Sequence, residues 1–317
     1  MAGVNFLEKF ELFLAGRARK TIVDYMSVLR GFEKWVLQET GQDQFHTKLL
    51  LPSTLEDYLT YTKAQGRSPR TQRKIMTILK LFCRWATDEG LLKHNPSRQL
   101  KSPAIEMDSH ELTTDQRRIL KRLVEQQDSP RLNAIFALGY WAGLRSSEVI
   151  RLQVKLCEVN QRTGTITLLE TKGGKKRTLD LHNKARQALY TYLYEIPSTY
   201  PDAHDEESSY VFTSQRAAWL RSQNQPDHLS VRGLEYLWTH TKTQASVSEW
   251  EQIQSVRFHD LRHDFSHRAR AAGWSLEEIA IYVGHQTQEG MPAILSTVRY
   301  TLPGREQLKA RLQQLKG

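Results

Sequence analysis

The stretch FHDLRHDF, residues 258–265, is the most specific local pattern in this sequence. His259 and Arg262 stand three residues apart, so on a helix they share one face. On that face an imidazole can exchange a proton while a guanidinium binds the same phosphate through two hydrogen bonds. The stretch therefore predicts a helix that handles a phosphate group.

The same stretch allows a second interpretation, a zinc site. His259 and His263 are four residues apart, the spacing of a helical pair of zinc ligands. Asp260 would then stand where such sites normally carry a longer glutamate base. His285 is the one clear candidate downstream for a third ligand.

A second segment, AGLRSSE at residues 142–148, places Arg145 just after a glycine in an otherwise apolar helical stretch. An arginine in such a setting needs an anionic partner. That partner is either a bound phosphate or an acid of the protein such as Glu148, and the sequence leaves both open.

A third segment, residues 163–181, has the composition of two strands on either side of Gly173-Gly174. This pattern predicts a β-hairpin, with Lys172 beside its turn and able to enter a groove. The return strand carries further cations that compete for any role of Lys172, namely Lys175, Lys176 and Arg177.

The fourth segment contains Gly284-His285 and, further on, Tyr300 between Arg299 and Thr301. An isolated tyrosine is usually a packing residue. Here it lies in a polar segment beside a basic residue, which favours a chemical role.

The candidate side chains together favour phosphoryl transfer without a metal, because no carboxylate cluster for a two-metal site accompanies them; they are Arg145, Lys172, His259, Arg262, His285 and Tyr300. Arg145 and Arg262 would neutralise the non-bridging oxygens. Tyr300 would attack phosphorus and hold the broken strand covalently. Lys172 would protonate the departing 5′ oxygen, with the two histidines as acid-base or orienting groups.

The first hundred residues are predicted to be helical and to carry a basic face. The chain has 45 Lys+Arg against 35 Asp+Glu, and residues 61–103 hold ten cations against Asp88 and Glu89. A helix is expected to begin at Thr21, a second after Pro52, and a third with Ser68 as its N-cap. One side of the third helix is apolar, and its opposite side presents Arg70, Arg73, Lys74, Thr77, Lys80 and Arg84.

That basic face carries no acid until Asp88, so it lacks the Glu-Lys pairs of a purely solubilising surface. A DNA backbone is its natural counter-surface. A merely solvated helix face remains the alternative.

A polar, proline-containing stretch separates two predicted domains. We expect a helical domain at residues 1–103, a linker at 104–110 and a mostly helical domain with a small hairpin at 111–317, with a short strand near residues 210–212. No segment reaches the ~20 apolar residues of a membrane helix, and no signal peptide precedes the domains. Two cysteines, Cys83 and Cys157, fit a reducing cytoplasm.

These motifs resemble those of the tyrosine recombinases, also called phage-type integrases. AGLRSSE is similar to the first arginine box and TKGGKKR to the hairpin lysine of that family. HDLRH is similar to the second box, Gly284-His285 to the third and Arg299-Tyr300-Thr301 to the nucleophile box. The resemblance covers nearly the whole chain, and the two-domain plan resembles Xer-like, plasmid-encoded or transposon-encoded members.

The resemblance implies a SAM-like core-binding domain followed by a catalytic domain of the DNA breaking-rejoining fold. It implies a site-specific recombinase that cuts and rejoins double-stranded DNA through a 3′-phosphotyrosine, in integration, excision or resolution. The resemblance further implies a homotetramer on DNA, with possible accessory proteins. It also implies a cytoplasmic, nucleoid-associated location without membrane contact, and no metal, nucleotide or other cofactor.

One interval departs from the family pattern. His285 and Tyr300 are further apart than is common in the family, and we expect residues 286–295 to contain extra positions. Tyr300 could therefore act in its own subunit or in a neighbour's. A type IB topoisomerase-like enzyme and a non-catalytic DNA-binding protein of the same fold remain the alternative functions.

Overall fold

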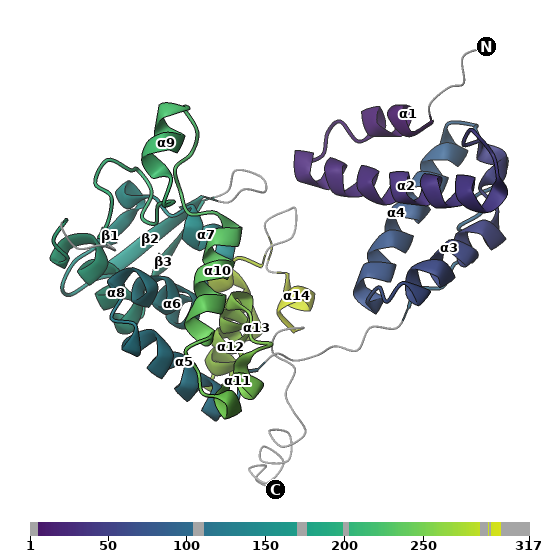
Figure 1. Cartoon of the computed structure of the whole chain (residues 1–317). Helices are drawn as coiled ribbons and strands as arrows, with labels where there is room; N and C mark the ends of the chain where they lie inside the picture. Colours follow the sequence, from purple (N-terminus) through teal and green to yellow (C-terminus); the bar gives the residue numbers. More distant parts are fainter. Residues whose placement is uncertain are drawn as a thin grey trace, which may run out of the picture. The chain divides into compact units, whose positions relative to one another are not determined.

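The structure, a computed structural model, describes residues 6–103, 111–169, 176–198, 203–285, 291 and 293–298. The chain divides into two units, Met1–Met107 and Asp108–Gly317, each with its own core (Figure 1). The division falls within the predicted linker, residues 104–110, which lie outside the described residues.

The first unit is helical, as predicted. Its described part, residues 6–103, contains the four α-helices α1 (Phe6–Phe13), α2 (Arg19–Thr40), α3 (Pro52–Ala64) and α4 (Pro69–Asp88), with a 3-10 turn at Thr47–Leu49. Helix α4 begins where expected, since the Ser68 hydroxyl accepts a hydrogen bond of 3.3 Å from the backbone N–H of Thr71. Helix α2 starts two residues before the expected Thr21 and ends at Thr40, followed by Gly41 with a left-handed φ of 65°.

The apolar side of α4 builds the core of this unit. Ile78, Leu79 and Phe82 are buried there among residues of α1, α2 and α3. The Phe82 ring meets the Phe10 ring edge to face, with centroids 5.1 Å apart. Packing of this face leaves the opposite, basic side of α4 toward solvent.

The second unit is mainly helical with one small sheet, which confirms the predicted fold class. Its described helices are α5 (Thr114–Gln126), α6 (Pro130–Ala142), α7 (Ser146–Ile150), α8 (Asn183–Tyr190), α9 (Ala217–Ser222), α10 (Val231–Lys242), α11 (Val247–Ile253), α12 (Phe258–Ala271), α13 (Leu276–Val283) and α14 (Ile294–Val298). A 3-10 turn at Val154–Leu156 and a π turn at Thr191–Glu195 complete the helical segments that can be described. Helix α6, nearly all of which is buried, packs against α5, α8 and α12.

The sheet contains the predicted hairpin. Strand β2 (Gly164–Leu169) pairs with β3 (Lys176–Asp180) in antiparallel register, with Leu169 opposite Lys176. A strand that the sequence did not predict, β1 (Cys157–Val159), pairs with the other edge of β2. Lys172 and the predicted turn fall within residues 170–175, which lie outside the described residues.

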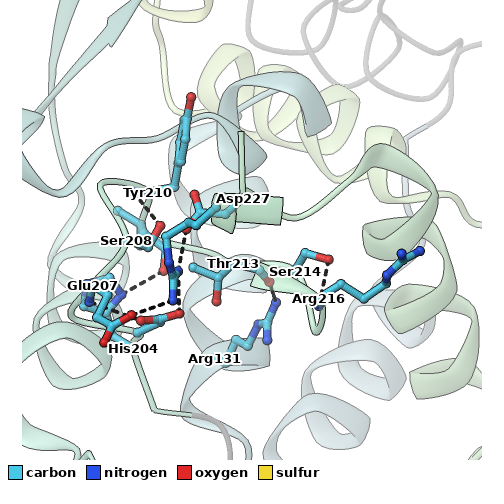
Figure 2. A network of polar contacts seen from close by, with 12 residues as sticks. Arg131, His204, Glu207, Ser208, Tyr210, Thr213, Ser214, Arg216 and Asp227 are labelled. Atoms are coloured by element: carbon cyan, nitrogen blue, oxygen red, sulfur yellow. Dashed lines mark hydrogen bonds and ion pairs between the residues drawn. The ribbon is translucent and has the colours of Figure 1, made fainter. Parts of the chain in front are cut away.

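The expected strand near residues 210–212 is replaced by isolated bridges, Gln153 to Tyr210 and Thr213 to His228. Ion pairs hold this polar segment together (Figure 2). Arg221 of α9 contacts carboxylate oxygens of Asp205 at 2.9 Å and Asp227 at 2.7 Å. Arg131 donates to the backbone carbonyl of Thr213.

None of the helices in the described ranges is long and apolar enough to cross a membrane.

Candidate active site

Arg262 is the centre of the site. It lies on α12 and is fully buried. Its guanidinium donates to the carbonyl of Gly143 at 2.8 Å and to the carbonyl of Val283. These carbonyls lie at the C-terminal ends of α6 and α13, where helices expose unpaired oxygens with partial negative charge. Arg262 therefore joins three helices.

The glycines of two sequence motifs make this arrangement possible. Gly143 and Gly284 follow α6 and α13 with left-handed φ values of 62° and 70°, which end the helices. A Cβ atom on Gly284 would lie 2.4 Å from a guanidinium nitrogen of Arg177. Gly284 therefore supplies both the turn and the space that Arg177 occupies.

Glu148 of α7 connects three arginines. Its carboxylate lies 2.7 Å from Arg145, 2.9 Å from Arg177 and 3.6 Å from Arg262, measured to the nearest guanidinium nitrogen. Burial alone would raise the pKa of Glu148, but Arg262, Arg177 and Arg145 outweigh burial and lower this pKa to about 2. Glu148 is thus ionised at neutral pH.

One carboxylate faces three guanidinium groups here, so the cluster of Arg145, Arg177, Arg262 and Glu148 has an excess of positive charge. Arg262 and Arg177 are buried, whereas the Arg145 side chain is 33% exposed. Arg145 also donates to the Gly284 carbonyl at 3.0 Å. The arginine cluster can attract an anion and offers Arg145 to it from the solvent side.

Two histidines lie beside the arginine cluster. Burial, followed by the charge of Arg262, lowers the pKa of His259 to about 4 and that of His285 to about 3. Both rings are therefore neutral at pH 7. A neutral imidazole can accept a proton at one nitrogen and donate a hydrogen bond from the other.

His285 also contacts the last described helix, α14. The backbone N–H of Ala293 donates to the His285 carbonyl at 2.6 Å. The Nδ1 atom of His285 lies 3.2 Å from the Thr297 hydroxyl. Tyr300 follows α14 in the chain and lies outside the described residues, as does Lys172.

The structure brings together four of the six predicted catalytic residues and adds one that the sequence analysis named only as a competitor for the role of Lys172. Arg145, His259, Arg262 and His285 are electrostatically coupled. The added residue is Arg177. Alternation along β3 could have identified it, because Arg177 shares a face with the buried Leu179 whereas Lys176 and Thr178 point outward.

The described residues provide no third ligand beside His259 and His263 for the alternative zinc site. The rings of His259 and His263 meet edge to face, with centroids 4.8 Å apart. No group of three or more His, Cys, Asp or Glu side chains placed to hold a metal occurs among the described residues.

The predicted DNA-binding residues of α4 differ in their surroundings. Arg70, Arg73 and Arg84 are exposed. The Lys74 amine contacts the Asp24 carboxylate of α2 at 3.0 Å, a partner that the sequence of α4 does not reveal. The Lys80 amine donates to the Leu100 carbonyl at 2.6 Å.

The Thr77 side chain is exposed beside these residues. Its hydroxyl donates to the Arg73 carbonyl, at 2.8 Å. The freely exposed part of the basic face therefore consists mainly of arginines.

We predict that Glu148→Gln destabilises the second unit by roughly 3–5 kcal/mol, because three guanidinium groups lose their counter-charge. Urea denaturation of the variant measures the effect. Glu277→Gln, on the exposed side of α13, is the matched control and should stay within about 0.5 kcal/mol of wild type. Wild-type stability of Glu148→Gln would contradict the role of Glu148.

We predict a pH dependence from His285. Its pKa lies well below the ordinary value of 6.5, so the unfolded chain binds the proton first and stability falls as the pH drops from 6.5 toward 3. His285→Gln should reduce the slope of unfolding free energy against pH by up to about 1.4 kcal/mol per pH unit in this window.

Denaturation series between pH 4.5 and pH 8 test this slope. Above pH 7.5 the difference between variant and wild type should be constant. Parallel curves throughout the acidic range would refute the assignment of a buried neutral imidazole.

Comparisons with known proteins agree with this geometry. Residues 111–301 match the model of the phage integrase family. The chain is 27% identical over 310 residues to the TnP I resolvase of Bacillus thuringiensis, covering 94% of this chain and 95% of the resolvase. It is 30% identical over 234 residues to the tyrosine recombinase XerC of Pseudomonas syringae pv. tomato, covering 73% and 71% of the two chains.

Among solved structures, the integrase of the transposon Tn1549, in complex with transposon right end DNA, superposes with a TM-score of 0.72 at 17% identity. The match covers 98% of both chains, which shows that the fold is shared. With the family model spanning more than half of the sequence, the chain belongs to the phage integrase family, as a tyrosine site-specific recombinase.

Proposed function

We propose that the arginine cluster binds the scissile phosphate of a DNA recombination site and that Tyr300 cleaves the strand. The observation that carries this proposal is the gathering of Arg145, Arg177 and Arg262 on the single carboxylate of Glu148. Their surplus positive charge, held in a partly buried place, is suited to the charge that develops on the non-bridging oxygens.

In the proposed reaction the Tyr300 hydroxyl oxygen bonds to phosphorus and the bond from phosphorus to the 5′ oxygen breaks. The tyrosine proton passes to His259, and Lys172 supplies a proton to the departing 5′ oxygen. The product is a 3′-phosphotyrosine and a free 5′ hydroxyl. Attack by the 5′ hydroxyl of another strand reverses these steps and rejoins the DNA.

The neutral state of His259 supports its role as proton acceptor. Its pKa is held down first by burial and then by the charge of Arg262. A bound phosphodiester would offset that charge and so raise the pKa of His259. The imidazole would therefore gain proton affinity when substrate is present.

Chain connectivity supports Tyr300 as the nucleophile. Thr297 contacts His285, and Tyr300 follows Thr297 by three residues. Three residues span at most about 11 Å. This short connection is compatible with Tyr300 reaching the arginine cluster of its own chain, and we therefore propose attack within the same subunit.

We further propose that residues 1–103 form the core-binding domain, residues 104–110 the linker and residues 111–317 the catalytic domain. Arg70, Arg73 and Arg84 would contact DNA phosphates first, since Lys74 and Lys80 already have partners. The proposal also includes a homotetramer on DNA, accessory proteins and a cytoplasmic, nucleoid-associated location, as the family resemblance implies. Carriage on a mobile element is suggested by the similarity to a resolvase and to a transposon integrase.

We predict that Tyr300→Phe abolishes covalent attachment to site DNA while folding and DNA binding persist, because the change removes one oxygen and little volume. Denaturing gels with a panel of candidate site duplexes detect the adduct.

Tyr282→Phe is the matched control and should keep the adduct. Burial raises the pKa of Tyr282 to about 12, and its hydroxyl donates to the Asp180 carbonyl at 2.9 Å. An adduct formed by Tyr300→Phe would place the nucleophile elsewhere.

We predict that replacing Arg70, Arg73 and Arg84 with Ala weakens binding to all DNA sequences. The slope of log affinity against log salt should become shallower by roughly 0.9 for each lost phosphate contact. Fluorescence anisotropy at several salt concentrations measures both quantities. Lys9→Ala, an exposed lysine of α1 outside the basic face of α4, is the control and should leave the slope unchanged. An unaltered slope in the triple variant would make this face a solvated surface only.

A further inference from the structure

The surroundings of His285 contain a hydroxyl that the proposed mechanism does not yet use. Thr297 of α14 is fully buried, and its Oγ1 atom lies 3.2 Å from Nδ1 of His285. The same oxygen lies 3.4 Å from the carbonyl oxygen of Ala293. The Thr297 hydroxyl thus has two possible acceptors, one on each side.

A hydroxyl can remain hydrogen-bonded to a histidine nitrogen whether or not that nitrogen carries a hydrogen. It can donate its hydrogen to a bare Nδ1 atom, or accept a hydrogen bond from a protonated one. In the second case its own hydrogen needs another acceptor, and the Ala293 carbonyl is at hand. A backbone carbonyl in the place of Thr297 could serve only the protonated nitrogen.

The ring of His285 needs such a partner because it is buried among cations. At pH 7 it is neutral and holds one hydrogen. A phosphate bound at Arg145, Arg177 and Arg262 would favour a hydrogen on the side of the ring that faces the anion. A buried nitrogen left without a partner during this change would cost stability.

Backbone contacts add to the side-chain contact. The Ala293 N–H donates to the His285 carbonyl, and the His285 N–H donates to the Ala280 carbonyl of α13 at 2.8 Å. The start of α14 is therefore fixed to the same residue whose ring Thr297 contacts. The Thr297 hydroxyl therefore both orients the His285 ring and attaches α14, the helix that precedes Tyr300 in the chain, to His285.

We propose that Thr297 is a positioning residue, whose hydroxyl holds the His285 imidazole in both of its hydrogen-bonding states and docks the segment that leads to Tyr300. The structural part of this inference stands on the described contacts. Its catalytic part rests on the proposed function.

The test compares Thr297→Val, which keeps the shape and removes the hydroxyl, with Thr297→Ser, which keeps the hydroxyl. Thr60→Val is the matched control, because the Thr60 hydroxyl also donates to a carbonyl four residues earlier but lies on α3, in the other unit. Thermal denaturation of every variant establishes that it is folded.

The first readout is the ¹⁵N signals of the His285 ring, recorded without DNA. Thr297→Val should shift them, while Thr297→Ser and Thr60→Val should leave them near wild type. The second readout is the rate of adduct formation, which should fall roughly 10-fold in Thr297→Val, the loss expected for one neutral hydrogen bond, and recover in Thr297→Ser.

The inference is overturned if either readout of Thr297→Val equals wild type, or if Thr297→Ser is as impaired as Thr297→Val. Absence of any adduct from the wild-type protein would instead refute the proposed function. In that case the ¹⁵N signals of the ring alone would still test whether Thr297 is hydrogen-bonded to His285.

Discussion

The contact of one carboxylate with three guanidinium groups is the interaction on which the rest of the second unit's site depends. Glu148 follows α6 closely in the chain, Arg177 belongs to the hairpin and Arg262 to α12, so this contact joins segments far apart in sequence. Arg262 extends the connection to α13 through the Val283 carbonyl. Moving any of these segments would therefore weaken ion pairs or hydrogen bonds that hold the others.

The same contact explains why the site is suited to an anion. Glu148 compensates only part of the arginine charge, and the carbonyls at two helix ends bind Arg262 without neutralising it. Burial, and after it the remaining arginine charge, lowers the pKa of His259 and of His285, so both rings are neutral at pH 7. Phosphate binding would relieve this repulsion, so substrate and protonation state are coupled through electrostatics.

The sequence allowed the local features of the fold to be predicted, whereas tertiary partners had to come from the structure. The Ser68 cap and the hairpin follow from short-range rules. Strand β1 has three residues, too few for a periodic pattern. The sequence left phosphate and Glu148 open as partners of Arg145. The structure shows Arg145 in contact with Glu148 and partly exposed, which leaves part of its guanidinium accessible to the phosphate of the proposed function. The pairing of Lys74 with Asp24 joins residues 50 positions apart, which the pattern of one helix cannot show.

We propose above that this site cleaves DNA by forming a covalent bond between Tyr300 and a 3′ phosphate. The most direct measurement is to trap the protein on a nicked site duplex, digest the adduct and sequence the modified peptide by mass spectrometry. We expect the peptide containing Tyr300 to carry a nucleotide linked through its 3′ phosphate. Attachment at another residue, or through a 5′ phosphate, would contradict it.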